Sequence, residues 1–116
     1  MSSSKIILDF GSFTLEAKLF DKDISRKLAD NLPYKIQLQQ WGEEVYGSIG
    51  IDLGEDSPVA KIPCGGIAYT NNGNYLCIFF GQTPAWPVEY IGQINDDGWQ
   101  KLLTQPTFSS VEIIKK

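Results

Sequence analysis

The clearest evidence for the fold comes from residues 66–80, which read GIAYTNNGNYLCIFF. Two runs rich in β-branched, aromatic and other apolar residues, 66–70 and 75–80, flank a polar segment with an Asn-Gly pair at its centre. An Asn-Gly pair between two such runs is the strongest short-range signal of a β-hairpin, because both residues accept the positive φ of a tight turn. The nearly continuous apolarity of residues 75–80 also predicts a central strand that is buried on both faces.

The N-terminal part of the chain predicts a second hairpin. Residues 6–10 and 13–19 each alternate apolar and polar side chains, as half-buried strands do. Gly11-Ser12 joins the two runs, and its glycine can take the positive φ that a type II′ hairpin turn needs.

The apolar spacing then changes to that of a helix. Asp21 or Asp23 can cap this helix, and Pro33 ends it, because the residue before a proline is pushed out of the helical region. The apolar residues fall four apart on one face: Ile24, Leu28 and Leu32.

A second, short helix is expected near the C-terminus. It begins after Asp96 or Asp97 and ends before Pro106. We expect it to pack three apolar side chains inward: Trp99, Leu102 and Leu103.

Four further strands complete the expected set. They lie at residues 34–41, 43–46, 89–94 and 108–114, with a glycine-containing loop over residues 47–63. About eight strands with two short helices and no alternation of strand and helix predict a mostly β domain, a closed or nearly closed antiparallel barrel. We find no repeat or linker that divides residues 1–116, so the sequence predicts a single domain.

Composition excludes several classes of partner. The formal net charge is −4, and the ten basic residues are scattered, so the chain lacks the cationic patch that nucleic acids or anionic membrane surfaces require. No apolar run approaches the ~20 residues of a membrane span. The start of the sequence has no apolar signal-peptide core, and we expect a cytoplasmic protein.

Histidine is absent, which removes Ser-His-Asp and Cys-His catalysis and most zinc or iron sites. Cys64 and Cys77 match neither a redox pair nor a zinc motif, so we expect no metal and no cofactor. Residues 47–54 lack the Lys-Ser/Thr ending of a phosphate-binding loop.

Two pairs of neighbouring acidic residues could suggest acid–base catalysis. Glu43 and Glu44 are neighbours on a strand and therefore point to opposite faces, which argues against a two-carboxylate catalytic pair. We interpret the pair at residues 96–97 as a helix cap.

Residues 79–86 read FFGQTPAW, and YIGQI follows at 90–94 before a short helix. This order resembles that of the cyclophilins. The segments LP (32–33), WGEEVY (41–46), GIAY (66–69) and FFGQTP (79–84) more specifically resemble a prokaryotic group of minimal cyclophilin-like proteins of unknown function. The resemblance covers most of the chain. It implies a compact eight-stranded barrel capped by helices, with a surface groove that binds proline-containing peptides in true cyclophilins.

The resemblance also bears on prolyl isomerase activity. Cyclophilins use a groove arginine to stabilise the twisting Xaa-Pro bond. The corresponding strand here, near residues 43–48, has no cation, the family's groove histidine is missing, and the one arginine, Arg26, falls in the first helix.

We therefore expect a non-catalytic or uncharacterised cyclophilin-like domain that binds a peptide or small ligand in a shallow aromatic groove. Phe80 and Trp86 match the aromatic groove positions of the family, and Glu44, next to Tyr46, can line the edge of a pocket. The expected ligand-binding residues are Glu44, Tyr46, Tyr69, Phe80, Gln82, Thr83 and Trp86. A weak peptidyl-prolyl isomerase and a structural or oligomerisation module are the alternatives.

Overall fold

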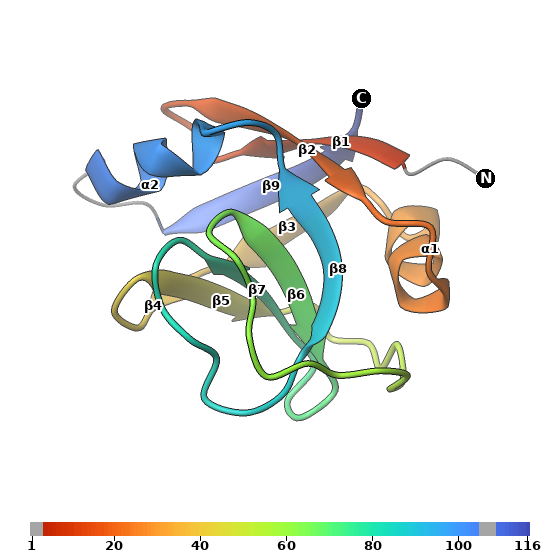
Figure 1. The fold of residues 1–116 in the computed structure, drawn as a ribbon. Coiled ribbons are helices and arrows are strands. Elements are labelled where there is room, and N and C mark those ends of the chain that lie inside the picture. The colour runs from red at the N-terminus through yellow and green to blue at the C-terminus, as the bar shows by residue number, and fades with distance from the viewer. Residues whose placement is uncertain (1–3, 105–108) are drawn as a thin grey trace.

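Antiparallel strands dominate the computed structural model, which describes residues 4–104 and 109–116 (Figure 1). Within these residues every strand pairing is antiparallel. The strands are β1 (Ser4–Asp9), β2 (Thr14–Leu19), β3 (Tyr34–Gln37), β4 (Gln39–Gln40), β5 (Glu44–Ser48), β6 (Gly66–Thr70), β7 (Tyr75–Phe79), β8 (Glu89–Ile94) and β9 (Ser110–Lys115). The helices are α1 (Asp23–Asp30), the 3-10 turn η1 (Gly98–Gln100) and α2 (Lys101–Thr104).

The strands form one sheet in the order β3-β9-β1-β2-β8-β6-β7-β5-β4. This sheet curls into a nearly closed barrel, which confirms the predicted fold class with nine strands in the described part of the chain instead of about eight. The difference arises at residues 34–41, which the sequence analysis expected to form one strand. The chain breaks there at Leu38, so that β3 pairs with β9 while β4 pairs with β5. A short segment thus connects the two edges of the sheet and closes the barrel.

Both predicted hairpins are present. Asp9 pairs with Thr14 across the first turn, and Thr70 pairs with Tyr75 across the second. Gly73 in the second turn has a φ of +96°, a left-handed value at which a side chain would be strained.

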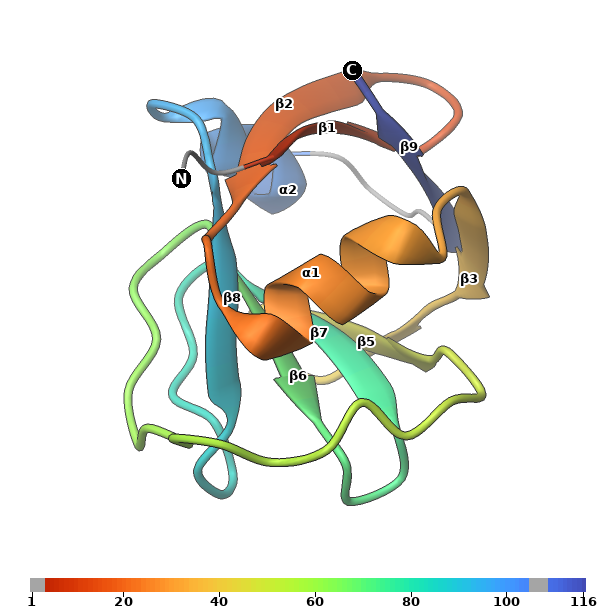
Figure 2. The same ribbon diagram turned by 90° about the vertical axis from the view of Figure 1, so that its right-hand side faces the viewer.

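Helix α1 buries Ile24 and Leu28, as its four-residue spacing predicted. The helix ends at Asp30, so Leu32 lies beyond it, although Leu32 still packs against the core. Figure 2 looks onto this helix, which lies across the barrel between β8 and β3. The expected cap is wrong: the N-cap is Lys22, and no side chain caps the helix. Asp21 and Asp23 instead form ion pairs with Arg26, because its guanidinium lies within reach of both carboxylates at this end of the helix.

The second helical segment starts at the predicted place, with Asp97 as the N-cap of η1, although the Asp97 side chain makes no capping hydrogen bond. Leu102 is buried and Trp99 packs against the core, but Leu103 is 48% exposed instead of inward-facing. Consecutive residues on a short helix cannot both face the same core, and Leu102 takes that position. Pro106 and Phe108, where the helix was expected to end and the last strand to begin, lie outside the described residues.

The main core fills the barrel interior with one face of each long strand, under α1. A second apolar cluster lies on the outside of β6 and β7 and contains Ile62, Ala68, Cys77, Phe79 and Val88. Strand β7 is therefore buried on both faces, as predicted: Leu76 and Ile78 point inward, and Cys77 and Phe79 point outward.

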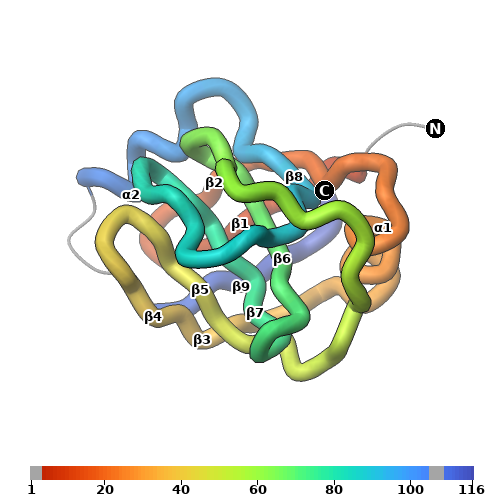
Figure 3. Tube along the Cα trace, turned by 60° about the horizontal axis from the view of Figure 1, so that its bottom comes forward, coloured from red at the N-terminus to blue at the C-terminus, as the bar shows by residue number. Residues whose placement is uncertain are grey.

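Two loop segments cover this outer cluster. A backbone bridge between Val59 and Val88 holds the ends of these segments together. Figure 3 shows residues 81–88 (teal) and residues 55–62 (yellow-green) running beside one another over this side of the barrel. Because these loops cover the outer sheet only in part, they leave room for a surface cavity.

Candidate functional site

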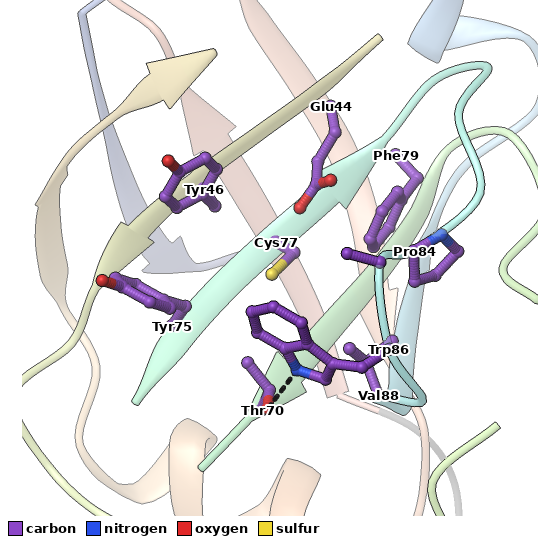
Figure 4. Close-up of a pocket in the computed structure, with 10 residues that line it drawn as sticks. Glu44, Tyr46, Thr70, Tyr75, Cys77, Phe79, Pro84, Trp86 and Val88 are labelled. Atoms are coloured by element: carbon purple, nitrogen blue, oxygen red, sulfur yellow. Dashed lines mark hydrogen bonds between the residues drawn. The ribbon is translucent and has the colours of Figure 1, made fainter. Parts of the chain in front are cut away.

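A cavity of about 250 Å³ lies on the outer face of the barrel, between strands β5, β7 and β6 and the loop at residues 84–88. Figure 4 shows its lining, in which aromatic and other apolar side chains surround one carboxyl group. The residues that line it are Glu44, Tyr46, Thr70, Tyr75, Cys77, Phe79, Pro84, Ala85, Trp86 and Val88.

Strand register brings the floor of the cavity together. Glu44 pairs with Phe79, and Tyr46 pairs with Cys77, across the β5–β7 ladder. Directly paired residues of antiparallel strands point to the same face, so all four side chains share the outer surface of the sheet. The intervening Val45 points inward and is fully buried in the main core.

Trp86 forms the wall opposite this floor. Its indole Nε1 donates a hydrogen bond to the Thr70 hydroxyl at 3.1 Å, which ties the loop to the end of β6 (Figure 4). Trp86 is 43% exposed, so its ring borders both the cavity and the solvent. Two residues after it, the bridge from Val88 to Val59 holds the loop in place.

Two tyrosines form a further side of the cavity. The rings of Tyr46 and Tyr75 meet edge to face, with centroids 5.3 Å apart, a favourable arrangement of aromatic quadrupoles. The Tyr46 hydroxyl donates to the Gln39 amide oxygen at 3.0 Å, which holds the Tyr46 ring in position from β4.

Glu44 is the one ionisable carboxyl group in the lining, and it is only 7% exposed. Figure 4 shows its carboxyl group pointing to the Cys77 sulfur. Burial raises the pKa of Glu44 to about 7, against the smaller opposing effect of the hydrogen bond with the Cys77 thiol. Burial and the neighbouring Glu44 in turn raise the pKa of Cys77 far above its usual range, so Cys77 is a neutral thiol.

Of the seven residues expected from the sequence to form the site, the structure brings together Glu44, Tyr46 and Trp86. Gln82 and Thr83 lie outside the cavity lining: the Gln82 amide oxygen accepts from the backbone N–H of Glu43 at 3.2 Å, and Thr83 is exposed.

Tyr69 and Phe80 face the barrel interior instead of the groove where they were expected. Tyr69 is fully buried, and its hydroxyl accepts from the Leu53 N–H at 2.8 Å and bonds to the Asn74 side chain at 2.9 Å. Phe80 is 2% exposed within the main core. Side chains alternate along β7, so the outward aromatic residue is Phe79, one position earlier.

Three residues of β7 that were not predicted as site residues project into the cavity at every second position of the strand: Tyr75, Cys77 and Phe79. Their signal was present in the alternation of residues 75–80. The continuous apolarity of that run hid which of its two faces carries the site. No sequence pattern indicated the remaining lining residues, which are Thr70 and the loop residues Pro84, Ala85 and Val88.

Positive charge is absent from the part of the lining that the structure describes. Arg26 lies on α1 and forms ion pairs there with Asp21 and Asp23. Within residues 4–104 and 109–116, no three histidine, cysteine or acidic side chains come together to hold a metal ion. The same residues contain no helix long and apolar enough to cross a membrane.

Together, the barrel, the helix that lies across it and the outer aromatic cavity define a class of small antiparallel β-barrel domains with a cavity on the outside of the barrel. The family model described as Cyclophilin-like matches residues 4–114, and the chain belongs to this family. The fold is similar to that in the solution structure of the hypothetical protein AF2241 from Archaeoglobus fulgidus, with a TM-score of 0.78 and 24% identity. That match covers 98% of this chain and 95% of the other. No functionally curated protein matches the sequence significantly.

Proposed function

We propose that this cyclophilin-like domain binds a small organic molecule, or one side chain of a peptide, in the cavity between β5, β7 and the loop at residues 84–88. The observation that supports this most is the combination of aromatic walls with one buried carboxyl group, assembled from segments far apart in the sequence. Apolar walls with a few placed polar groups are the usual composition of a ligand site.

The size of the cavity limits the ligand. Its volume of about 250 Å³ lies below the ~300–1,000 Å³ of pockets for drug-sized molecules. A single side chain or a molecule of similar size fits such a space, whereas a longer peptide would have to lie outside it. We therefore favour recognition of one compact group.

We propose binding without prolyl isomerase catalysis because of the groups that line the cavity. Stabilising a twisted Xaa-Pro bond needs a preorganised hydrogen-bond donor close to the proline. The described lining contains no arginine, lysine or histidine, and the Trp86 indole N–H is already bonded to Thr70. Glu44 is the one strong polar group that faces the cavity, and its role is to orient a ligand.

The proposal can be tested by nuclear magnetic resonance with a panel of compact probes: phenol, indole, choline and a succinyl-Ala-Pro anilide. Binding in the cavity should shift the indole N–H signal of Trp86 together with the amide signals of Thr70 and Cys77. The indole N–H of Trp41, which is 49% exposed and lies outside the lining, is the internal control. The proposal fails when no probe shifts these signals, or when the shifts lie elsewhere on the barrel.

A further inference from the structure

Glu44 has an unusual environment for a carboxyl group. It is 93% buried and aims into a cavity, and no lysine or arginine of the described chain forms an ion pair with it. A buried carboxylate without a cationic partner is strongly disfavoured, and such groups are normally paired. The fold therefore leaves a position for a positive charge beside Glu44, and this position is open to the solvent through the cavity.

The walls next to Glu44 suit a positive charge as well. The cavity carries the rings of Tyr46, Tyr75, Phe79 and Trp86. Aromatic faces attract cations through their quadrupoles, and several rings around one site form the kind of cage that holds alkylated ammonium groups. The Tyr46–Tyr75 pair, tied to Gln39, and the Trp86–Thr70 hydrogen bond fix three of these rings before any ligand arrives.

Other classes of ligand fit less well. An anion would meet the Glu44 carboxylate without any cation in the described lining, in a chain of net charge −4. A purely apolar ligand would displace water from the carboxyl group and replace it with nothing that hydrogen-bonds or carries charge.

We propose that the cavity is a cage for an alkylated ammonium group, with Glu44 as the counter-ion and the rings of Tyr46, Tyr75 and Trp86 as its walls. This inference rests on the proposed function and adds the chemical class of the ligand. Such a group is carried by small free amines and by methylated lysine side chains of peptides, and the test below has one arm for each source.

Binding should depend on pH through Glu44. The groups that face it are the Tyr46 phenol on its own strand and the Cys77 thiol and Tyr75 phenol on β7, whereas residues 84–88 bring no ionisable group to it. The Cys77 thiol stays neutral, so Glu44 is the group that titrates near neutral pH, with a pKa of about 7. A quaternary ammonium ion keeps its charge at every pH. Its affinity should therefore rise about tenfold from pH 6 to pH 8, as Glu44 ionises.

The experiment is a calorimetric titration of the whole chain with choline and with its neutral isostere 3,3-dimethylbutan-1-ol, at pH 6 and pH 8. N-acetyl-trimethyllysine amide is the peptide arm. At pH 8 we expect the stronger of the two cations to bind at least ~10-fold more tightly than the isostere, the difference that one charge-assisted contact provides. Which cation binds more tightly identifies the source.

Two pairs of variants show which residues produce the preference for a cation. Glu44→Gln keeps the side-chain shape but removes the charge, and should lose both the preference for the cation and its pH dependence. Glu43→Gln, one residue away and exposed, is its matched control. Trp86→Leu should weaken cation binding, whereas Trp41→Leu should leave it unchanged. Thermal unfolding of each variant establishes that it is folded.

The outcomes separate this inference from the proposed function. If the isostere binds in the cavity as tightly as the cations, the cavity is an apolar ligand site, and the ammonium assignment is wrong. If the cations bind equally well to Glu44→Gln, Glu44 is not the counter-ion, and the assignment is wrong as well. If no cation binds but phenol or indole shifts the Trp86 signal, the ammonium assignment is wrong and the proposed function stands. Absence of binding by every probe overturns both.

Discussion

Glu44 carries a carboxyl group that points away from the barrel core and is nevertheless buried. Its position on β5 follows from strand alternation, which turns it outward while Val45 fills the core. The carboxyl group shares the lining of the outer cavity with the loop at residues 84–88, and Glu44 is only 7% exposed. The thiol of Cys77 is a weak hydrogen-bonding partner, so the desolvation is only partly offset. A carboxyl group that titrates near pH 7 is the result.

The raised pKa of Glu44 predicts a pH-dependent stability. The pKa rises from its ordinary 4.5 to about 7 in the fold, so the folded chain binds more protons than the unfolded chain between these values. The contribution of Glu44 is therefore most favourable below pH 4.5 and is lost as the pH rises through 7. Because Glu44 is only 7% exposed, we expect a loss on the order of 1–3 kcal/mol across this range.

Thermal unfolding from pH 5 to pH 8 measures this effect. The wild-type chain should lose stability relative to Glu44→Gln across this range, because glutamine does not titrate. Glu43→Gln should follow the wild-type curve. Parallel curves for the wild type and Glu44→Gln would contradict the assigned pKa.

Trp86 and Phe79 should respond differently to truncation although both line the cavity. Trp86 is 43% exposed, whereas Phe79 and its inward neighbour Ile78 are each 1% exposed. We expect Trp86→Ala to cost about 1 kcal/mol, because an exposed ring buries less area on folding. Phe79→Ala should cost ~3–5 kcal/mol and Ile78→Ala ~2–5 kcal/mol. Denaturant unfolding of the three variants tests this, and equal large losses would show that Trp86 supports the fold as a core residue does.

At the scale of the elements, the closure of the barrel depends on how β5 meets β3. The chain crosses from β3 to β4 at Leu38, whose N–H donates to the Ser109 carbonyl at 2.8 Å. Residues 34–40 can then pair with β9 at one end and with β5 at the other. This crossing brings the backbone of Gln37 against β5 at Gly47, where only a residue without a side chain fits.

Gly47→Ala should therefore destabilise the barrel strongly. A Cβ atom there would lie 2.1 Å from the Gln37 carbonyl oxygen and 2.4 Å from the Ile36 side chain, and the backbone atom cannot move without separating the strands. We expect a loss of ~1–3 kcal/mol or more, as for overpacking in a core. Gly98→Ala is the control, because its nearest contact is 3.3 Å from a side-chain methyl group. The prediction fails if chemical denaturation gives the two variants similar stabilities.

At the scale of the whole molecule, the barrel has its aromatic cavity outside and its packed core inside. In the described chain, β1, β2, β8 and β9 contribute large buried side chains to one core cluster inside the barrel, under α1. The cavity lies on the outer face of β5, β7 and β6, and the loop at residues 84–88 lines one side of it.

This arrangement predicts the absence of substantial prolyl isomerase activity. The described cavity lining has no cationic donor, and loss of one preorganised donor typically costs ~10²–10³ in rate. A protease-coupled assay on an Ala-Pro peptide measures it. A rate constant comparable with that of a genuine cyclophilin would contradict the prediction.

The sequence was sufficient for the features that depend on neighbouring residues. Alternation and the Asn-Gly turn predicted the hairpin of β6 and β7, and four-residue spacing predicted the buried face of α1. These features are predictable because backbone geometry fixes which way successive side chains point. Glu43 lies in a bend before β5 and is exposed, whereas Glu44 begins the strand and is buried.

The tertiary structure decided what depends on segments that meet from a distance. Only the register between β5 and β7 shows that Phe79, and not Phe80, shares a face with Glu44. Likewise, only the tertiary structure shows that the Glu44 carboxyl group is buried and desolvated. The sequence shows that the side chains of a strand alternate between two faces. When both faces are apolar, it does not show which face packs in the barrel core and which face lines the outer cavity. The packing of the whole chain decides this.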